Sequence, residues 1–179
     1  AIRDYKGYPK LDLNGIGLQA FRVLKDGGVM AVVINDGTKD FQKSLTSFRM
    51  VTYYVDNIGF KLFETVIYER DARPGAWWAQ RFKVNHEYVF IFFKGKKPKY
   101  FNKLPLYIPT KTAGTKWAGA QRLNNGQMIK TGNIVETAPT QCRGTIWKYN
   151  PSSREGNKLK VTHPATFPDK LAEDLIICF

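Results

Sequence analysis

The first quarter of the chain passes from a helical hydrophobic pattern to a strand pattern. Apolar side chains recur at helical spacing over residues 14–26, and Asn14 can cap the start of that helix. Gly27 and Gly28 follow as a stop signal. Residues 29–34 then form a continuous apolar run rich in β-branched side chains, which is typical of a strand buried on both faces of a parallel α/β sheet.

The middle of the chain continues with a second helix and two strands. A helical stripe of apolar side chains predicts a helix over residues 40–58, which Gly59 ends. The stripe consists of Phe41, Leu45, Phe48, Thr52, Val55 and Ile58. Residues 61–68 and 87–93 have the length and composition of strands.

In the last part of the chain, apolar side chains show little regular spacing before the final residues. Residues 144–149 are a strand candidate, and residues 168–178 predict a helix with Pro168 in its first turn. The expected inward face of that helix carries Leu171, Leu175 and Ile176. This order of elements indicates part of an α/β sheet with an irregular basic appendage. Three sheet strands outside the appendage are too few for a freestanding doubly wound sheet, so further strands are expected from beyond this sequence.

Positive charge is concentrated in one segment of the 179-residue chain. The net charge is +13, from 28 basic and 15 acidic side chains. Residues 94–160 hold 14 of the basic side chains, against only Glu136 and Glu155. Phosphate backbones are the commonest partner of such a surface, and a solvated basic face is the alternative.

The composition also bounds the class of protein. A hydrophobic fraction of 43% and an aromatic fraction of 14% are those of a folded chain. No apolar run approaches the roughly 18 residues that span a bilayer, and the first residues do not resemble a signal peptide. Cys142 and Cys178 form no metal-like cluster. These two cysteines make a reducing cytoplasm the default expectation. Because no apolar run is long enough to span a bilayer, no membrane partner is expected.

Two short motifs suggest chemistry that their surroundings do not support. Gly15, Gly17 and Ala20 fit a G-x-G-x-x-A dinucleotide fingerprint, but the polar, proline-containing residues before them do not form the required buried strand. His86 and Glu87 fit the start of a zinc-protease motif, but the second histidine is missing and the segment is strand-like. We therefore expect no metal site and attribute the glycines to the start of a helix.

The loop between the two middle strands is unusually dense in arginine and tryptophan. It contains Arg70, Arg73, Arg81 and the adjacent Trp77 and Trp78. Two consecutive tryptophans of an extended chain cannot both face one core. Such a loop can stack on an unpaired base while its arginines hold phosphates. The alternative places one tryptophan in the core and the other at the surface.

Short motifs lie in a fixed order along the chain. Residues 22–28 read Arg-Val-Leu-Lys-Asp-Gly-Gly, residues 86–95 begin His-Glu-Tyr and end Phe-Phe-Lys-Gly, and residues 144–147 read Gly-Thr-Ile-Trp. Residues 163–171, His-Pro-Ala-Thr-Phe-Pro-Asp-Lys-Leu, are the most specific of them. Together these segments resemble the beta-type DNA amino-methyltransferases, which methylate the exocyclic nitrogen of adenine or cytosine.

The resemblance covers nearly the whole chain and implies where the catalytic parts lie. In that family a (D/S)-P-P-Y catalytic motif precedes the target-recognition region, and the cofactor motif F-x-G-x-G comes last. The opening residues 1–5 resemble the continuation of the catalytic motif, so that motif is expected just before Ala1, with no catalytic residue in the chain. The implied fold is a partial Rossmann-like methyltransferase sheet. Residues 1–95 would be core, 96–160 an irregular basic target-recognition insert and 161–179 a cofactor-side helix.

The resemblance also implies the cofactor, the partners and the binding residues. The cofactor is S-adenosylmethionine, and the partner is double-stranded DNA with one flipped base. The cofactor-binding candidates are His163, Pro164, Thr166, Phe167, Pro168, Asp169, Asn35 and Asp36. The DNA-binding candidates are Arg70, Arg73, Trp77, Trp78, Arg81, Lys83, Lys111, Lys116, Gln121, Arg122 and Arg143.

The expected activity of this chain differs from that of a whole enzyme. Because neither essential motif occurs in the 179 residues, we expect weak DNA binding and no methyl transfer by the chain alone. The alternatives are a non-catalytic DNA-binding module and one half of a split methyltransferase, in which a second subunit supplies the missing part. A setting in restriction–modification is expected from the family, whereas the recognition sequence and the target base stay open.

Overall fold

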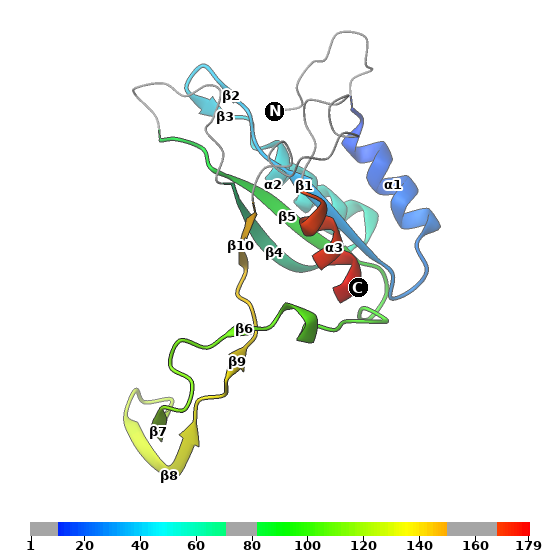
Figure 1. Ribbon diagram of the computed structural model, residues 1–179. Helices are drawn as coiled ribbons and strands as arrows, with labels where there is room; N and C mark the ends of the chain where they lie inside the picture. The colour runs from blue at the N-terminus through cyan, green and yellow to red at the C-terminus, as the bar shows by residue number, and fades with distance from the viewer. Residues whose placement is uncertain (1–10, 71–81, 150–167) are drawn as a thin grey trace. The chain divides into compact units, whose positions relative to one another are not determined.

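The computed structural model describes residues 11–70, 82–149 and 168–179 (Figure 1). The chain divides into two compact units. The sheet unit comprises the described residues up to Asn102 and from Thr145 onward, and the hairpin unit is Lys103–Gly144. No helix in the described ranges has the length and apolar character needed to cross a membrane.

A four-stranded sheet, in the order β1-β5-β4-β10, forms the centre of the sheet unit. Its strands are β1 (Val29–Ile34), β4 (Lys61–Arg70), β5 (His86–Phe93) and β10 (Ile146–Tyr149). β5 is antiparallel to both of its neighbours, whereas β10 runs parallel to β4. The four strand predictions are confirmed in place, with bounds that differ by a residue or two.

The direction and burial predicted for β1 are wrong. β1 is antiparallel to β5, and most of its side chains are only half-buried, with Ala31 exposed. β-branched residues favour any pleated, partly buried surface, so an apolar run of this kind indicates a strand without indicating its direction. The observed sheet is therefore mixed rather than purely parallel.

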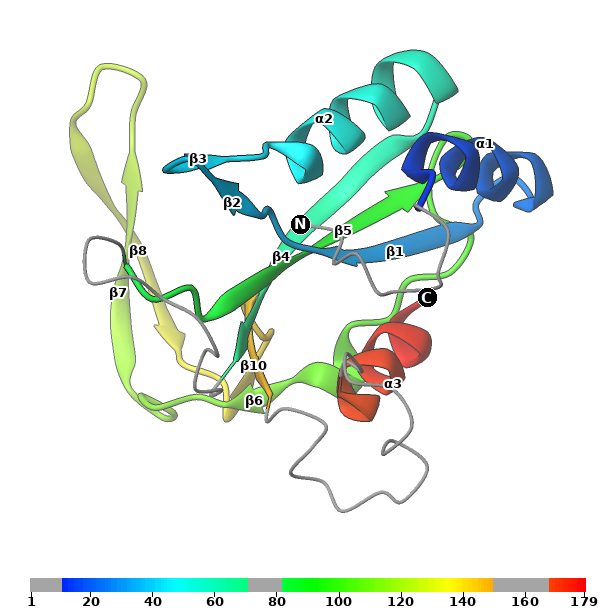
Figure 2. The same cartoon turned by 90° about the horizontal axis from the view of Figure 1, so that it is seen from above.

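Helices cover both faces of this sheet (Figure 2). α1 (Leu13–Val23) and α2 (Thr46–Tyr53) lie on one side, and α2 continues into a short π-helical turn, Tyr54–Ile58. α3 (Asp169–Cys178) lies on the other side. The sheet unit therefore has the mixed α/β architecture that the alternating patterns predict.

Asp12, rather than the predicted Asn14, caps the first turn of α1. The Asp12 carboxylate accepts a hydrogen bond of 3.0 Å from the N–H of Gly15, one of the donors that a helix start leaves without a backbone partner. α1 ends at Val23, earlier than the predicted residue 26. The two glycines of the stop signal therefore lie in the turn after the helix.

Lys94 joins the end of α1 to the end of β5. Its ammonium group donates to the carbonyls of Phe21 (2.8 Å) and Leu24 (2.9 Å), and it lies 4.6 Å from the centre of the Phe21 ring. Gly27, with φ of 81°, approaches Lys99 so closely that a Cβ there would lie 2.8 Å from the Lys99 nitrogen. The motif at residues 22–28 therefore meets the motif at residues 86–95. Lys94, a basic residue of the charged segment, stabilises the fold through these contacts.

The helix predicted over residues 40–58 is only partly correct. Its first residues belong instead to a hairpin of two short antiparallel strands, β2 (Thr38–Lys39) and β3 (Gln42–Lys43), and α2 begins at Thr46. The predicted end is confirmed, because Gly59 closes the π-helical turn with φ of 97°.

α2 also buries a different face from the predicted stripe. Ser47, Met50 and Tyr54 are buried, whereas Phe48 and Val55 are exposed. Ser47 faces inward because the buried carboxylate that follows β1 binds its N–H and its hydroxyl. A hydrophobic pattern does not record a polar contact of this kind, so it predicts the wrong buried face for α2.

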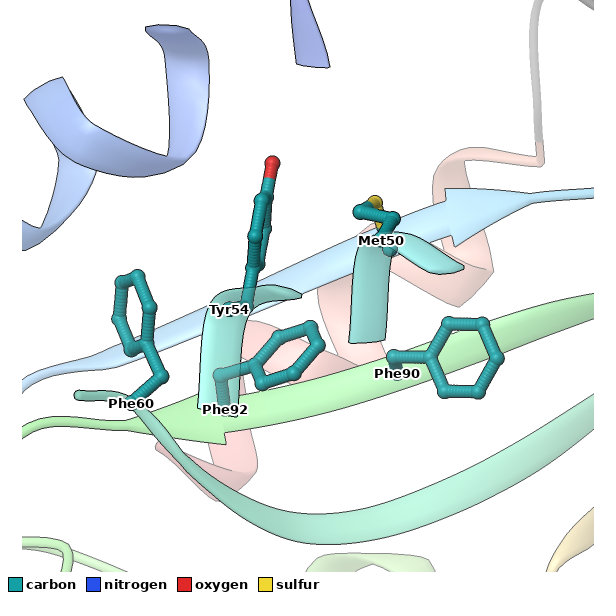
Figure 3. Close-up of a cluster of buried hydrophobic side chains, with 5 residues drawn as sticks. All are labelled: Met50, Tyr54, Phe60, Phe90 and Phe92. Carbon is teal, nitrogen blue, oxygen red and sulfur yellow. The ribbon is translucent and has the colours of Figure 1, made fainter. Parts of the chain in front are cut away.

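The core between α2 and the sheet is largely aromatic. It consists of Met50, Tyr54, Phe60, Phe90 and Phe92 (Figure 3). The Phe92 ring centre lies 5.3 Å from that of Tyr54 and 5.7 Å from that of Phe60. The Tyr54 hydroxyl points toward α1 and donates a hydrogen bond of 2.6 Å to the Leu13 carbonyl. Ring contacts of this kind stabilise the core beyond the area that they bury, and the hydroxyl fixes α1 against it.

α3 packs on the opposite face of the sheet. Its buried side chains are Leu171, Asp174, Leu175 and Cys178. Two of the three predicted inward positions are confirmed, but Ile176 is 75% exposed, so the prediction is wrong there. The Asp174 carboxylate accepts a hydrogen bond of 2.6 Å from the Tyr149 hydroxyl, which ties the helix to β10.

The hairpin unit consists of strands that the hydrophobic pattern did not predict. A long hairpin joins β7 (Lys116–Arg122) to β8 (Met128–Glu136), and the short strands β6 (Ile108–Pro109) and β9 (Thr140–Gln141) pair with each other. A 3-10 turn, Leu104–Leu106, precedes them. Nearly every side chain of β7 and β8 is exposed, so neither face imposes the apolar–polar alternation of a half-buried strand.

Candidate functional site

Polar side chains cluster where β1 ends and α2 begins. Asp36 directly follows β1, and its buried carboxylate accepts hydrogen bonds from the Ser44 hydroxyl (3.0 Å), the Ser47 N–H (3.0 Å) and the Ser47 hydroxyl (2.5 Å). A negative group is favoured at a helix start, where N–H donors need acceptors. Asp36 therefore fixes the start of α2 against the end of β1.

The surroundings of Asp36 keep it ionised. Burial by itself raises its pKa, but the hydrogen bonds from Ser47 and Ser44 outweigh burial and hold the pKa below its usual value of 3.8. A group that exchanges protons during a reaction needs a pKa near the working pH. Asp36 is therefore suited to hold structure rather than to act as a general acid or base.

Asn35 closes the same cluster toward β5. Its side-chain amide donates a hydrogen bond of 2.7 Å to the His86 carbonyl, and its side-chain oxygen accepts one of 2.7 Å from the Asp36 N–H. The side chains of Asn35 and Asp36 are thus engaged within the protein. This arrangement fits residues that position a site better than residues that bind a cofactor directly.

A pocket of about 290 Å³ opens beside this cluster. Its polar lining is Asn35, Asp36, Lys43, Lys83 and His86, and its apolar lining is Leu45, Phe48, Phe82, Val84 and Tyr88. The Tyr88 ring centre lies 5.4 Å from that of Phe48 and 5.3 Å from that of His86. Aromatic walls with a few polar groups are suited to a flat ring system.

Sequence reasoning missed several residues of this pocket. The hydrophobic pattern places Leu45 and Phe48 in a helical stripe, and it places Tyr88 in a strand that carries the His-Glu-Tyr motif. The sequence argument uses His86 for a zinc-protease motif, which the surrounding residues exclude, and as the first residue of the His-Glu-Tyr motif, but not for a pocket. The described residues contain no group of three or more His, Cys, Asp or Glu side chains that could hold a metal. The aromatic residues around β5 were the available signal, but their arrangement depends on the rotation of α2.

The arginine-rich loop is described only at its two ends. Arg70 at the end of β4 forms an ion pair with Glu87 on the neighbouring strand β5, with 2.9 Å between Nη1 and Oε1. Lys83 lines the pocket. The charge of Arg70 is therefore partly offset, whereas Lys83 is an exposed residue of the pocket lining. The candidates Arg73, Trp77, Trp78 and Arg81 lie outside the described residues.

The other DNA-binding candidates belong to the hairpin unit. Lys111, Lys116, Gln121 and Arg122 are exposed, and Arg143 is half-buried. The strand register pairs Ala120 with Lys130 and Arg122 with Met128. Because successive residues of a strand face opposite ways, Arg122 and Lys130 share one face of the hairpin and Gln121 points to the other.

The cofactor candidates near α3 are only partly described. Pro168 is buried where the helix begins, and Asp169 is exposed in its first turn. α3 lies across the sheet from α2, so the structure does not bring these two residues together with Asp36 (Figure 2). His163, Pro164, Thr166 and Phe167 lie outside the described residues.

The family model for DNA methylases of the N6/N4 type matches residues 3–179, and the chain belongs to this family. The resemblance inferred from the motifs is thereby confirmed.

Two relatives show how far the likeness extends. The orphan methyltransferase M.BamHII of Bacillus amyloliquefaciens is 33% identical over 181 residues, which cover 98% of this chain and 66% of that protein. The solved structure of PvuII DNA methyltransferase (cytosine-N4-specific) matches with a TM-score of 0.65 at 18% identity, over 98% of this chain and 58% of that one. At that identity the second match concerns the fold alone. The chain spans about two thirds or less of the length of each relative.

Proposed function

We propose that the protein containing this chain transfers a methyl group from S-adenosylmethionine to the exocyclic amino group of adenine or cytosine in duplex DNA. The observation that carries the proposal is the family match over residues 3–179, which includes both the sheet unit and the basic hairpin unit. Residues 1–95 and 161–179 then contribute to a partial Rossmann-like core, and residues 96–160 to target recognition.

The hairpin unit has the charge of a surface that contacts the DNA backbone. Residues 103–144 contain six basic side chains and one acidic side chain, Glu136. Exposed cations such as Lys116 and Arg122 neutralise phosphates and release counterions. Gln121, on the opposite face from Arg122, carries the donor and acceptor that base edges require. Phosphate contacts would set the register of the hairpin on the duplex, and Gln121 would contribute to sequence preference.

The pocket beside Asp36 is the proposed place of the flipped base. The amino group of a paired base lies inside the duplex, so the base must leave the stack before it can react. Phe48 and Tyr88 offer aromatic surface to its ring, and Lys83 offers a charge to a nearby phosphate. Asn35 and Asp36 would hold the wall of the pocket in place.

S-adenosylmethionine, when bound, supplies the methyl group. The residues proposed to lie along it are those of segment 163–169, of which the structure describes Pro168 and Asp169. An exposed carboxylate such as that of Asp169 fits the positive charges of this cofactor. The buried Pro168 fixes the direction in which the chain enters α3.

Transfer of labelled methyl from S-adenosylmethionine to mixed-sequence duplex DNA tests the proposal. The complete protein is expected to label DNA, and digestion to nucleosides then identifies the methylated base. Residues 1–179 alone are expected to transfer nothing, since they contain neither Pro-Pro-Tyr nor F-x-G-x-G. A complete protein that binds DNA and transfers no label would contradict the proposal and favour a non-catalytic DNA-binding module.

A further inference from the structure

The turn of the β2–β3 hairpin is strained and carries an exposed aromatic ring. Asp40 and Phe41 have φ angles of 49° and 60°, in the left-handed region that favours glycine. Phe41 is 65% exposed. Strain of this kind is concentrated at functional positions, and most of the surface of Phe41 is open to solvent.

The base of the hairpin is anchored to the same carboxylate that fixes α2. The Ser44 N–H donates to the Gly37 carbonyl at 3.0 Å, and the Ser44 hydroxyl donates to the Asp36 carboxylate at 3.0 Å. The Lys43 ammonium group donates to the Asp36 carbonyl at 3.3 Å. The direction of the hairpin is therefore set by contacts with a buried residue rather than left to the turn.

The hairpin also leads directly into the pocket. Lys43 and Leu45, which end the hairpin and follow it, both line the pocket. Lys39 and Lys43 lie on either side of Phe41 in the sequence, on the paired strands β2 and β3. An aromatic tip next to the cation of Lys39, beside a pocket suited to a flat ring, has the chemistry to meet both the bases and the phosphates of a duplex.

We propose that the β2–β3 hairpin enters the DNA and that Phe41 fills the space that the flipped base leaves in the stack. Removing a base from the stack exposes the faces of its two neighbours to water, and an inserted apolar side chain covers them. Lys39 on β2 pairs with a flanking phosphate, whereas Lys43 on β3 keeps its contact with the Asp36 carbonyl. The inference rests on the proposed function, because a gap in the stack exists only if the protein flips a base.

A short duplex with a central abasic site mimics the gap and serves as the probe. The complete protein is expected to bind this duplex about tenfold more tightly than the intact duplex of the same sequence, a ratio in the range of one base–aromatic stacking contact. Phe41→Ala and Phe41→Gly are expected to abolish the preference, and Phe41→Trp to keep it. Glycine at position 41 also relieves the positive φ, so the melting temperature of Phe41→Gly is expected to equal or exceed that of the wild type.

Val23→Ala is the matched control, because Val23 is also 65% exposed and lies at the end of α1. It is expected to leave the preference unchanged. A wild-type protein with no preference for the abasic duplex, or a Phe41→Gly variant that keeps it, would overturn the inference. The same holds if Phe41→Ala changes the oligomeric state and not the preference, since Phe41 would then contact a second copy of the chain.

Methyl transfer measured on the same proteins separates this inference from the proposed function. A wild type that methylates DNA without preferring the abasic duplex contradicts the role of Phe41 and leaves the activity standing. A wild type that neither binds nor methylates DNA contradicts both.

Discussion

The Asp36 carboxylate lies 2.5 Å from the hydroxyl oxygen of Ser47 and 3.0 Å from the Ser47 nitrogen. This pair joins the end of β1 to the first turn of α2. It decides which face of α2 is buried, and it places Phe48 of the same helix at the pocket rather than in the core. One buried polar contact therefore links the packing of the sheet unit to the shape of its candidate site.

Replacing Asp36 by asparagine is expected to lower the free energy of unfolding by about 1–3 kcal/mol, because one acceptor oxygen becomes a donor that faces the donors of Ser47. Urea unfolding measures the change. Asp26→Asn, at an exposed carboxylate, is the matched control and is expected to change stability by less than about 0.5 kcal/mol. Equal stability of the two variants would show that the Asp36 contacts contribute nothing.

The contribution of Asp36 is also expected to depend on pH. Its pKa in the folded state is below 3.8, so folding favours the ionised form. The resulting stability is fully present above the unfolded-state pKa and is lost as the pH falls from there through the lower folded-state pKa. The difference in unfolding free energy between wild type and Asp36→Asn should therefore be constant near neutrality and narrow in more acidic buffer. A difference that widens on acidification would refute this assignment.

Lys94 is expected to stabilise the fold rather than bind DNA. Lys94→Met keeps most of the side-chain length but removes the hydrogen bonds to the carbonyls of Phe21 and Leu24 and the charge over the Phe21 ring. The expected loss is about 1–2 kcal/mol of unfolding free energy, measured by urea titration. Lys25→Met, at an exposed lysine near the same helix end, should leave stability unchanged. Lost DNA affinity with unchanged stability in Lys94→Met would reverse the assignment.

Local patterns predicted the strands of the sheet, because the strand tendency of a segment such as Val29–Ile34 depends on its own consecutive residues. They did not predict the direction of β1, which depends on its partner β5, or the inward face of α2, which depends on the contact between Asp36 and Ser47. Motifs such as the segment at residues 163–171 identified the family but not the pocket. Those motif residues are consecutive in the chain, whereas the pocket exists only after folding.

The long hairpin was missed for a different reason. The turn between β7 and β8 has a sequence signal, Asn125-Gly126, and Gly126 adopts a φ of 87° as such turns require. The flanking strands lack alternation because apolar residues such as Trp117 and Ile134 are exposed on them. A pattern method that expects one buried face finds no strand in such a segment.

The arrangement of β7 and β8 predicts two separable effects on DNA binding. Arg122 shares one face of the hairpin with Lys130, whereas Gln121 points to the other. Arg122→Ala is expected to weaken binding to all sequences alike and to reduce the slope of log K against log salt concentration by about 0.9, the change for one phosphate contact.

Gln121→Ala should instead leave the slope unchanged and reduce the discrimination between duplexes of different sequence, because an amide reads base edges without neutralising a phosphate. Titration of each variant against several duplexes over a range of salt separates the two effects. Lys94→Met serves as the basic-residue control and should keep the wild-type slope, since its charge is held at the end of α1. An unchanged slope in Arg122→Ala would mean that this face of the hairpin does not meet the phosphate backbone, and would contradict the proposed phosphate contacts of the hairpin unit.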